Sequence, residues 1–480
     1  MAQPMNNKRA RKETKSSGPE LQFRWRNFRS FKDTGWFDLR PVTVVLGANN
    51  SGKTNLIRPL LLLKQTLDSG DDDIALKITG PLADVGTYKN AVHGRRKNRT
   101  FEFCLRLQSL GQNTEKKKLK SVGTYPPGEV RLEFGKGRDP LEVELLRFEI
   151  FDIYGRRCLL RKRTASGSYT LSTPLAIKSP LLKIAKAVKP IHFTFSGFSI
   201  IRQLFEEKER TIRRRAKGKK SKVRNSVTLD LSGKDSDYLS YLSAAEAYIR
   251  QTFSGLNYIG PLRDYPKRFY ESTEEVPEAV GVRGELAPHI LYLTKRDQLA
   301  PKTNEWLKKF GLARSISWDS FHDDLFALKV TDLHGESSVD YSDSGFGLSQ
   351  LLPLIVQGFH STDKEILFFE QPEIHLNPRL QCQLANLFAE MSASKKTVIV
   401  ETHSEHLVLR IRTLIAEGKL RPEDVALYYV EKEGVSSVLR KIPISKNGHI
   451  EPNQWPVGFF EESLGEALRL ARVSSTKGGR

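Results

Sequence analysis

One stretch of the chain has the residue types and the spacing of a phosphate-binding loop. It consists of Gly47, Ala48, Asn49, Asn50, Ser51, Gly52, Lys53 and Thr54. An apolar run at 42–46 precedes it and a helical pattern at 55–63 follows it, which is the strand, loop and helix order that such a loop requires. The alternative is an accidental match in a turn rich in glycine and asparagine.

The chemistry of these residues indicates ATP and Mg²⁺ as cofactors. Glycines let successive backbone N–H groups face the phosphates, and the N-terminus of the following helix adds positive partial charge. Lys53 can reach the β- and γ-phosphates, and the hydroxyl of Thr54 can bind Mg²⁺. The predicted nucleotide-contacting residues of this loop are Gly47, Asn50, Ser51, Gly52, Lys53, Thr54 and Asn55.

Two further apolar runs end in groups that are suited to hydrolysis. The run at 366–369 is followed by Glu370, Gln371, Pro372 and Glu373. In nucleotide hydrolases a strand beside the phosphate loop ends in a carboxylate that directs Mg²⁺, so Glu370 is a predicted metal ligand together with Thr54. The run at 397–400 leads to His403, which can bond a γ-phosphate or orient the attacking water. The alternatives are a buried strand that meets a polar turn and a structural histidine.

A turn of small residues at 342–350 precedes an apolar helix from Leu351. Small residues before a helix leave its N-terminus open to a phosphate. An ordinary N-capped helix has the same appearance.

Composition bounds the class of protein. The 480 residues suffice for two or three domains or for one large domain with insertions, and the apolar runs are far too short to span a bilayer. The basic N-terminus has no apolar segment of the secretory type, and three scattered cysteines favour a reducing, cytoplasmic setting. The net charge of +21 suits nucleic acid or an acidic protein partner, and equally a solvated basic surface.

Four segments are predicted along the chain. Residues 1–19 form a disordered basic tail, and residues 20–172 hold the phosphate loop and antiparallel strands. Residues 173–256 are read as a helical insertion with a basic loop, and residues 257–480 complete the α/β fold. The densest basic run, 208–224, contains no aromatic residue that could stack on bases. It is either a DNA-backbone contact or a flexible solvated loop.

Taken together, the four elements resemble the head of an ABC-type ATPase, over roughly residues 21–105 and 257–470. This resemblance implies an α/β P-loop head with a mixed core sheet, a flanking antiparallel sheet and a helical insertion. In that family the loop of one head faces the signature turn of another, with ATP between them. At least a dimer is therefore implied, in which Ser344, Gly345 and Gly347 contact the γ-phosphate held by the partner.

A narrower resemblance is carried by five segments in order. They are 258–263, 282–285, 344–347, 370–376 and 455–460. These segments are similar to those of the OLD/RecF-like AAA ATPases of bacterial anti-phage defence, most of all the AriA ATPases of PARIS systems. That resemblance implies an oligomer that holds a TOPRIM-type nuclease from a neighbouring gene and releases it when a phage-encoded trigger protein is sensed.

The chain departs from the ABC pattern at one catalytic position. Most ABC heads end the carboxylate strand with Asp-Glu, and the glutamate is the general base. Here these positions are Glu370 and Gln371, and an amide cannot accept a proton, although it could position water. We therefore expect slow hydrolysis, or hydrolysis that relies on Glu373 or His403.

Two functional hypotheses follow from the sequence. The first is an ATPase that acts as a sensor and scaffold in anti-phage defence. The second is a DNA-binding repair or maintenance ATPase of the SMC/RecF kind that uses the basic run at 208–224.

Overall fold

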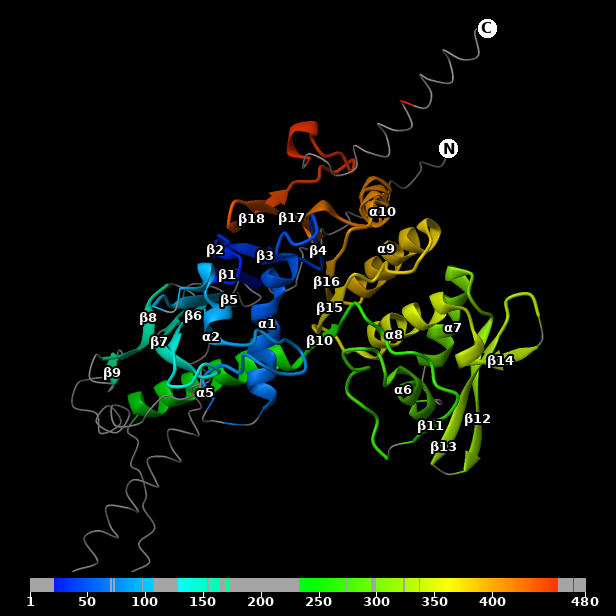
Figure 1. Ribbon diagram of the computed structural model, residues 1–480, viewed down its shortest axis with the longest axis horizontal. Helices are drawn as coiled ribbons and strands as arrows, with labels where there is room; N and C mark the ends of the chain where they lie inside the picture. The colour runs from blue at the N-terminus through cyan, green and yellow to red at the C-terminus, as the bar shows by residue number, and fades with distance from the viewer. Residues whose placement is uncertain are drawn as a thin grey trace, which may run out of the picture.

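The computed structural model describes most of the chain as three sheets and the helices that cover them (Figure 1). The described residues are 21–69, 71, 74–96, 98–107, 128–152, 155–164, 169–172, 233–272, 274–294, 299–322, 324–335, 337–455 and 469. The predicted tail at 1–19 and the basic run at 208–224 lie outside them, as does most of the predicted insertion.

The central sheet is mixed, as predicted. Its order is β10 (Leu256–Ile259), β15 (Ile366–Glu370), β16 (Thr397–Glu401), β4 (Val42–Gly47), β17 (Val425–Glu433) and β18 (Ser436–Ile442). The first five strands are parallel, and β18 alone pairs antiparallel, with β17. Strand β16 lies between the carboxylate strand β15 and β4, the strand that leads into the phosphate loop.

The flanking antiparallel sheet is also confirmed. It contains β1 (Leu21–Phe28), β2 (Phe31–Asp33), β3 (Phe37–Leu39), β5 (Phe101–Leu107), β6 (Glu129–Lys136), β7 (Val143–Phe151), β8 (Arg157–Arg163) and β9 (Tyr169–Ser172). Along β1, buried and half-buried residues alternate because successive side chains of a strand point to opposite faces of the sheet. One face of this sheet therefore supplies aromatic side chains to a core.

Two helices lie against this sheet. Helix α1 (Lys53–Asp68) begins at the phosphate loop, and the indole Nε1 of Trp25 donates to the carbonyl oxygen of Leu56 at 2.7 Å. Helix α5 (Gly233–Ser254) runs beside α1 in Figure 1 and buries Ile249 and Phe253 in the same core. The short helix α2 (Tyr88–Ala91) follows the turn at residues 84–87.

The other face of the central sheet carries a second group of elements. Its helices are α6 (Ala287–Leu293), α7 (Leu299–Phe310), α8 (Phe346–His360), α9 (Pro378–Ala393) and α10 (Glu405–Ala416). A small antiparallel sheet lies beside them, with β11 (Tyr270–Glu271), β12 (Ser315–His322), β13 (Leu325–Thr331) and β14 (Ser338–Asp340). Within the described part of the chain, no helix is long and apolar enough to cross a membrane.

Two hydrophobic cores result from this layering. On β15, Phe368 belongs to the core with the antiparallel sheet, whereas Leu367 and Phe369 belong to the core with α8 and α9. A parallel sheet covered on both faces must be apolar on both, which explains the continuous apolar runs of the sequence. The carboxyl ends of the parallel strands meet at one edge, and that edge carries the candidate site.

Candidate functional site

The phosphate loop adopts a backbone conformation that only glycine tolerates at two positions. Gly47 has φ +153°, and a Cβ atom there would lie 2.4 Å from the carbonyl oxygen of Val430. Gly52 has φ +100° and forms the N-cap of α1, where a Cβ atom would lie 2.4 Å from Ser30 Oγ. The loop is therefore shaped by the close approach of other elements at both glycines, where a side chain would not fit.

Lys53 is the buried cation of the loop. Its ammonium group donates to the carbonyl oxygens of Gly47 at 3.0 Å and Ala48 at 2.9 Å. Burial lowers its pKa, and this effect is opposed by the nearby carboxylates, of which Glu401 contributes most. A buried ammonium among carboxylates and at a helix N-terminus is a strong binding group for phosphate.

Neighbouring elements fix the loop with hydrogen bonds. Ser437 on β18 donates through its hydroxyl to the carbonyl oxygen of Ser51, and its backbone N–H donates to the carbonyl oxygen of Ser30 at 2.7 Å. The side-chain amide of Asn55 donates to Ser30 Oγ at 3.1 Å and accepts from Arg29 Nε at 3.2 Å. The predicted contact residue Asn55 therefore lies between the loop and the turn that joins β1 to β2.

Two carboxylates converge on the hydroxyl of Thr54. Its Oγ1 lies 3.5 Å from Glu370 Oε1 and 3.0 Å from Glu401 Oε1. The other oxygen of Glu370 accepts from the hydroxyl of Tyr258 at 2.6 Å. The structure thus brings Thr54 and Glu370, the two predicted metal ligands, within hydrogen-bond range, and it adds Glu401. Burial, followed by the negative charge of Glu370, raises the pKa of Glu401.

The turn after β15 carries the remaining predicted catalytic residues. Gln371 has φ +45°, and its backbone N–H donates to the carbonyl oxygen of Glu401 at 2.7 Å. The Oε1 atom of Glu373 accepts from the backbone N–H of His403 at 2.7 Å, and burial raises the pKa of Glu373. Burial, followed by the charge of Lys53, lowers the pKa of His403, which favours the neutral imidazole. Non-glycine residues in left-handed backbone concentrate at functional sites.

Arg263 supports this turn from behind. Its guanidinium donates to the carbonyl oxygens of Glu370 at 3.3 Å and Gln371 at 3.2 Å. Burial lowers the pKa of Arg263 to about 10, although Glu373 acts in the opposite direction. Arg263 thus positions the strand end and the strained residue after it.

The signature turn lies on the α8 side of the sheet. Ser344 Oγ donates to the carbonyl oxygen of Tyr341 at 2.6 Å, and Gly345 is the N-cap of α8. A Cβ atom at Gly345 would meet nothing within 4 Å. The ring of Phe346 packs edge-on against His375, with 4.9 Å between centroids. Ser344, Gly345 and Gly347 therefore adjoin the turn after β15, whereas Lys53 is held in the loop after β4.

The donor set fits a nucleotide with a divalent cation. Loop N–H groups, the helix N-terminus and Lys53 suit phosphate oxygens, and the hydroxyl and carboxylate oxygens around Thr54 suit a hard cation. The buried hydroxyl of Ser51 and one oxygen of Glu401 have no hydrogen-bond partner among the described residues. Those orphaned polar atoms are what a site for polar ligands leaves.

Sequence reasoning missed three contributors. Glu401 stands immediately before Thr402 and His403, and the sequence pattern gives it no role, because only the strand order shows that it faces Thr54. Tyr258 and Arg263 belong to a segment that carried the family resemblance, without a role. Their spacing of five residues does not reveal that both reach the end of β15.

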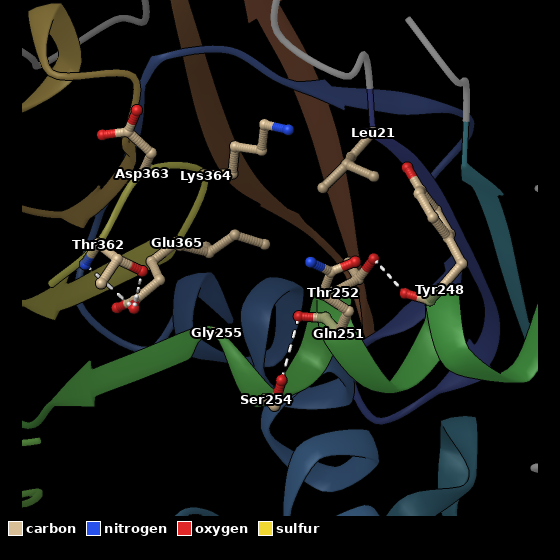
Figure 2. A pocket seen from close by; sticks show the side chains of 11 residues that line it. Leu21, Tyr248, Gln251, Thr252, Ser254, Gly255, Thr362, Asp363, Lys364 and Glu365 are labelled. Atoms are coloured by element: carbon tan, nitrogen blue, oxygen red, sulfur yellow. Dashed lines mark hydrogen bonds between the residues drawn. The ribbon is translucent and has the colours of Figure 1, made fainter. Parts of the chain in front are cut away.

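A cavity of about 300 Å³ lies elsewhere, at the amino end of β15 (Figure 2). Among its lining residues are Leu21, Tyr248, Thr252, Lys364 and Ile366. Ile366 and Glu370 stand at opposite ends of β15, about 13 Å apart at 3.3 Å per residue. This cavity is therefore separate from the phosphate loop.

The comparisons with known proteins agree with an ATPase. Residues 292–408 match the family described as AAA ATPase domain. This part of the chain is similar to ATPases. Residues 420–470 match a family described as a protein of unknown function (DUF3696), and no match is found among curated proteins.

Comparison with solved structures finds heads of SMC proteins at low sequence identity. The SMC head bound to the C-winged helix domain of ScpA is 14% identical, with a TM-score of 0.41, and the match covers 89% of this chain and 98% of that chain. The Smc head domain with an extended coiled coil from Pyrococcus furiosus is 13% identical, with a TM-score of 0.37 and coverages of 88% and 96%. The SMC head domain from Thermotoga maritima is 11% identical, with a TM-score of 0.35, and the match covers 88% of this chain and 99% of that chain.

The described chain has an α/β fold. It combines a mixed sheet that carries the phosphate loop, an antiparallel sheet on one face, and a helix with a small-residue N-terminus on the other.

Proposed function

We propose that this protein binds ATP with Mg²⁺ at the phosphate loop and hydrolyses it slowly. The observation that carries the proposal is the convergence of Lys53, Thr54 and Glu370 at the edge where the parallel strands of the central sheet have their carboxyl ends. Lys53 and the loop N–H groups bind phosphate oxygens, while Thr54 and Glu370 hold the cation. The bound cation supplies charge neutralisation of the phosphates.

Slow hydrolysis follows from the groups near the phosphate end. Gln371 replaces the usual proton acceptor with an amide, so it can orient water but cannot take its proton. Glu373 is buried with a raised pKa and is bonded to the backbone of His403, and the imidazole of His403 favours its neutral form. These two residues are the proposed alternatives for proton acceptance and water orientation.

A second copy of the chain completes the proposed site. The signature residues Ser344, Gly345 and Gly347 would bind the γ-phosphate held by the other head. Two features support this: Gly345 has open space around it, and exposed apolar side chains surround the turn. Tyr265 is 73% exposed and Phe346 is 43% exposed, with 6.0 Å between their rings. Large exposed aromatic side chains mark interaction surfaces.

The cellular role we propose is that of an AriA-type sensor and scaffold in anti-phage defence, acting in the cytoplasm. In this role the ATP-loaded oligomer holds a TOPRIM-type nuclease encoded by a neighbouring gene and releases it when a phage protein is sensed. A slow ATPase suits a switch that stays loaded better than it suits a motor. The resemblance of the five ordered segments supports this role.

The second candidate is a DNA-binding repair or maintenance ATPase of the SMC/RecF kind. It is favoured by the net charge of +21 and by the basic run at 208–224. Proteins that neutralise several phosphates lose affinity steeply with salt, so this role predicts strongly salt-dependent DNA binding.

One experiment separates the two roles. The full chain is expressed with its neighbouring gene, and both pull-down and DNA binding at several salt concentrations are measured. A nuclease that co-purifies without DNA supports the defence role. DNA binding that disappears when Lys and Arg in 208–224 are changed to Gln, without a co-purifying nuclease, contradicts it and supports the SMC/RecF-like role.

A further inference from the structure

A second carboxylate lies at the cation end of the site. Glu370 and Glu401 are directly paired in the register of β15 and β16. Both side chains reach the hydroxyl of Thr54, and the contact from Glu401 Oε1, at 3.0 Å, is the shorter of the two. Two acids at the ends of neighbouring strands thus share one hydroxyl.

Glu401 is a buried acid, but one of its carboxylate oxygens has no hydrogen-bond donor among the described residues, unlike those of a typical structural acid. The residue is 2% exposed, and its Oε2 atom has no hydrogen-bond partner among the described residues. Glu365, at the opposite end of the sheet, accepts from Asn257 Nδ2 at 2.7 Å and from Thr362 Oγ1 at 2.7 Å. Burying a carboxylate oxygen without a partner is unfavourable, so the free oxygen of Glu401 requires a positive group at the site.

Lys53 alone does not meet that requirement. Its ammonium group is bonded to the carbonyl oxygens of Gly47 and Ala48, and the charges of Glu401, Glu373 and Glu370 already act on it. Phosphates placed beside these acids would add further negative charge. A divalent cation between the acids and the phosphates removes this repulsion.

We infer that Glu401, together with Glu370 and Thr54, binds the divalent cation that accompanies the nucleotide. This inference rests on the proposed ATP site and deepens it. Within the described residues, no group of three or more His, Cys, Asp or Glu side chains could hold a metal ion. The protein therefore supplies two carboxylates and a hydroxyl, and phosphate oxygens complete the shell that such a cation needs. Cation binding is consequently nucleotide-dependent.

The test measures Mn²⁺ binding rather than turnover. Mn²⁺ replaces Mg²⁺, and its affinity for the full chain is measured by electron paramagnetic resonance with a non-hydrolysable ATP analogue. We expect Glu401→Gln to weaken Mn²⁺ binding by about tenfold or more, as does the loss of groups that hold a metal site. The matched control is Glu365→Gln, which removes an acid from the same sheet and leaves Mn²⁺ binding unchanged.

Two further measurements keep the outcome clear. Glu401→Gln removes a buried unpartnered charge without changing side-chain size, so its melting temperature without nucleotide equals or exceeds that of the wild type. Its affinity for the analogue in EDTA also equals or exceeds that of the wild type, because one repelling charge is gone. Wild-type Mn²⁺ affinity in a folded Glu401→Gln protein would overturn this inference but not the proposed ATP binding. Failure of the wild type to bind the analogue would overturn the proposed function itself.

Discussion

The phosphate loop and the signature turn differ in how completely one chain surrounds them. The loop at 47–55 is held by other elements of the same chain, because Ser30 and Ser437 bond to it and Val430 approaches Gly47, while residues 48–50 are exposed. At the signature turn, Gly345 has no atom within 4 Å of its Cβ position, and Phe346 is 43% exposed. One half of the proposed ATP sandwich is therefore rigidly built within a chain, and the other half presents an open surface.

Nucleotide binding and assembly therefore depend on different parts of the chain. Hydrogen bonds within the chain pre-organise the loop for phosphate, so nucleotide affinity depends on residues of a single copy. The open turn has groups suited to a phosphate but is separate from the loop. Its function is predicted to appear only in a pair of chains.

The largest expected effect is at the lysine of the phosphate loop. Lys53→Ala removes the buried ammonium, and we expect nucleotide affinity to fall by at least about 100-fold, equivalent to about 3 kcal/mol. Isothermal titration with ATP and Mg²⁺ measures it. The exposed Lys395, at the amino end of β16, is the control, and Lys395→Ala leaves affinity unchanged. Wild-type affinity in Lys53→Ala would show that the loop is not the site.

A pair of glycine substitutions sharpens the comparison. Gly47→Ala forces a Cβ atom against the Val430 carbonyl, so we expect a loss of about 1–3 kcal/mol in the free energy of unfolding and weaker ATP binding. Gly345→Ala meets open space, so stability changes by less than about 1 kcal/mol.

The two variants are also compared by sedimentation with ATP analogue and Mg²⁺. Gly345→Ala retains nucleotide binding but loses the analogue-induced dimer, because its methyl group would stand before the partner's γ-phosphate. If both variants behave alike in stability and in pairing, the contrast between a loop held within one chain and an open turn is wrong.

The hydrogen bonds to Asp38 on β3 predict that the stability of the protein depends on pH in the acid range. Burial alone would raise the pKa of Asp38, but hydrogen bonds from Lys441, Tyr428 and Arg40 outweigh it and lower the pKa from 3.8 to about 2. This difference corresponds to about 2 kcal/mol of stability at neutral pH. The contribution is fully present above pH 3.8 and is lost as the pH falls through the folded-state value of about 2.

Asp38→Asn therefore lowers the free energy of unfolding by about 2 kcal/mol at pH 7. This difference from the wild type disappears as the pH falls from about 4 to about 2. Urea unfolding at several pH values measures it. The exposed Asp363, which pairs with exposed Lys395, is the control, and Asp363→Asn costs less than about 1 kcal/mol. A gap that is independent of pH would contradict the assignment.

The smallest predicted effect concerns the turn that lies between the two regions. Gln371→Glu restores a proton acceptor at the position where most ABC heads have one, so we expect ATP turnover to rise by about tenfold or more. Phosphate release at saturating ATP measures it, and wild-type turnover is expected to be slow. Glu373→Gln tests the alternative acceptor. Fast wild-type turnover would contradict the role given to the amide.

Local patterns predicted the single elements of the fold well. The apolar run at 42–46 and the carboxylate run at 366–370 are β4 and β15, and the helical pattern from Asn55 lies within α1. The alternation from Leu21 and over 100–107 marks β1 and β5. These features depend on residues that are close in sequence, so the periodicity of the apolar residues is enough to predict them.

The order of the parallel strands was not predictable in this way. Parallel neighbours are set by long crossovers, and nothing in the run at 397–401 indicates that it lies between β15 and β4. The role of Glu401 depends on that order, which is why the sequence pointed to His403 and left the acid two residues earlier without a function. The three signature residues were predicted as a phosphate-facing turn, and their contact with a nucleotide stays a prediction.

The edge-on contact between Phe346 and His375 has a mechanical consequence. His375 is held in left-handed backbone, five residues after Glu370, in the same turn that contains the strained Gln371. A second chain that displaces the ring of Phe346 would therefore displace the turn at 371–375, which directly follows Glu370. Contact with a second chain and ATP hydrolysis would then both act on this one turn.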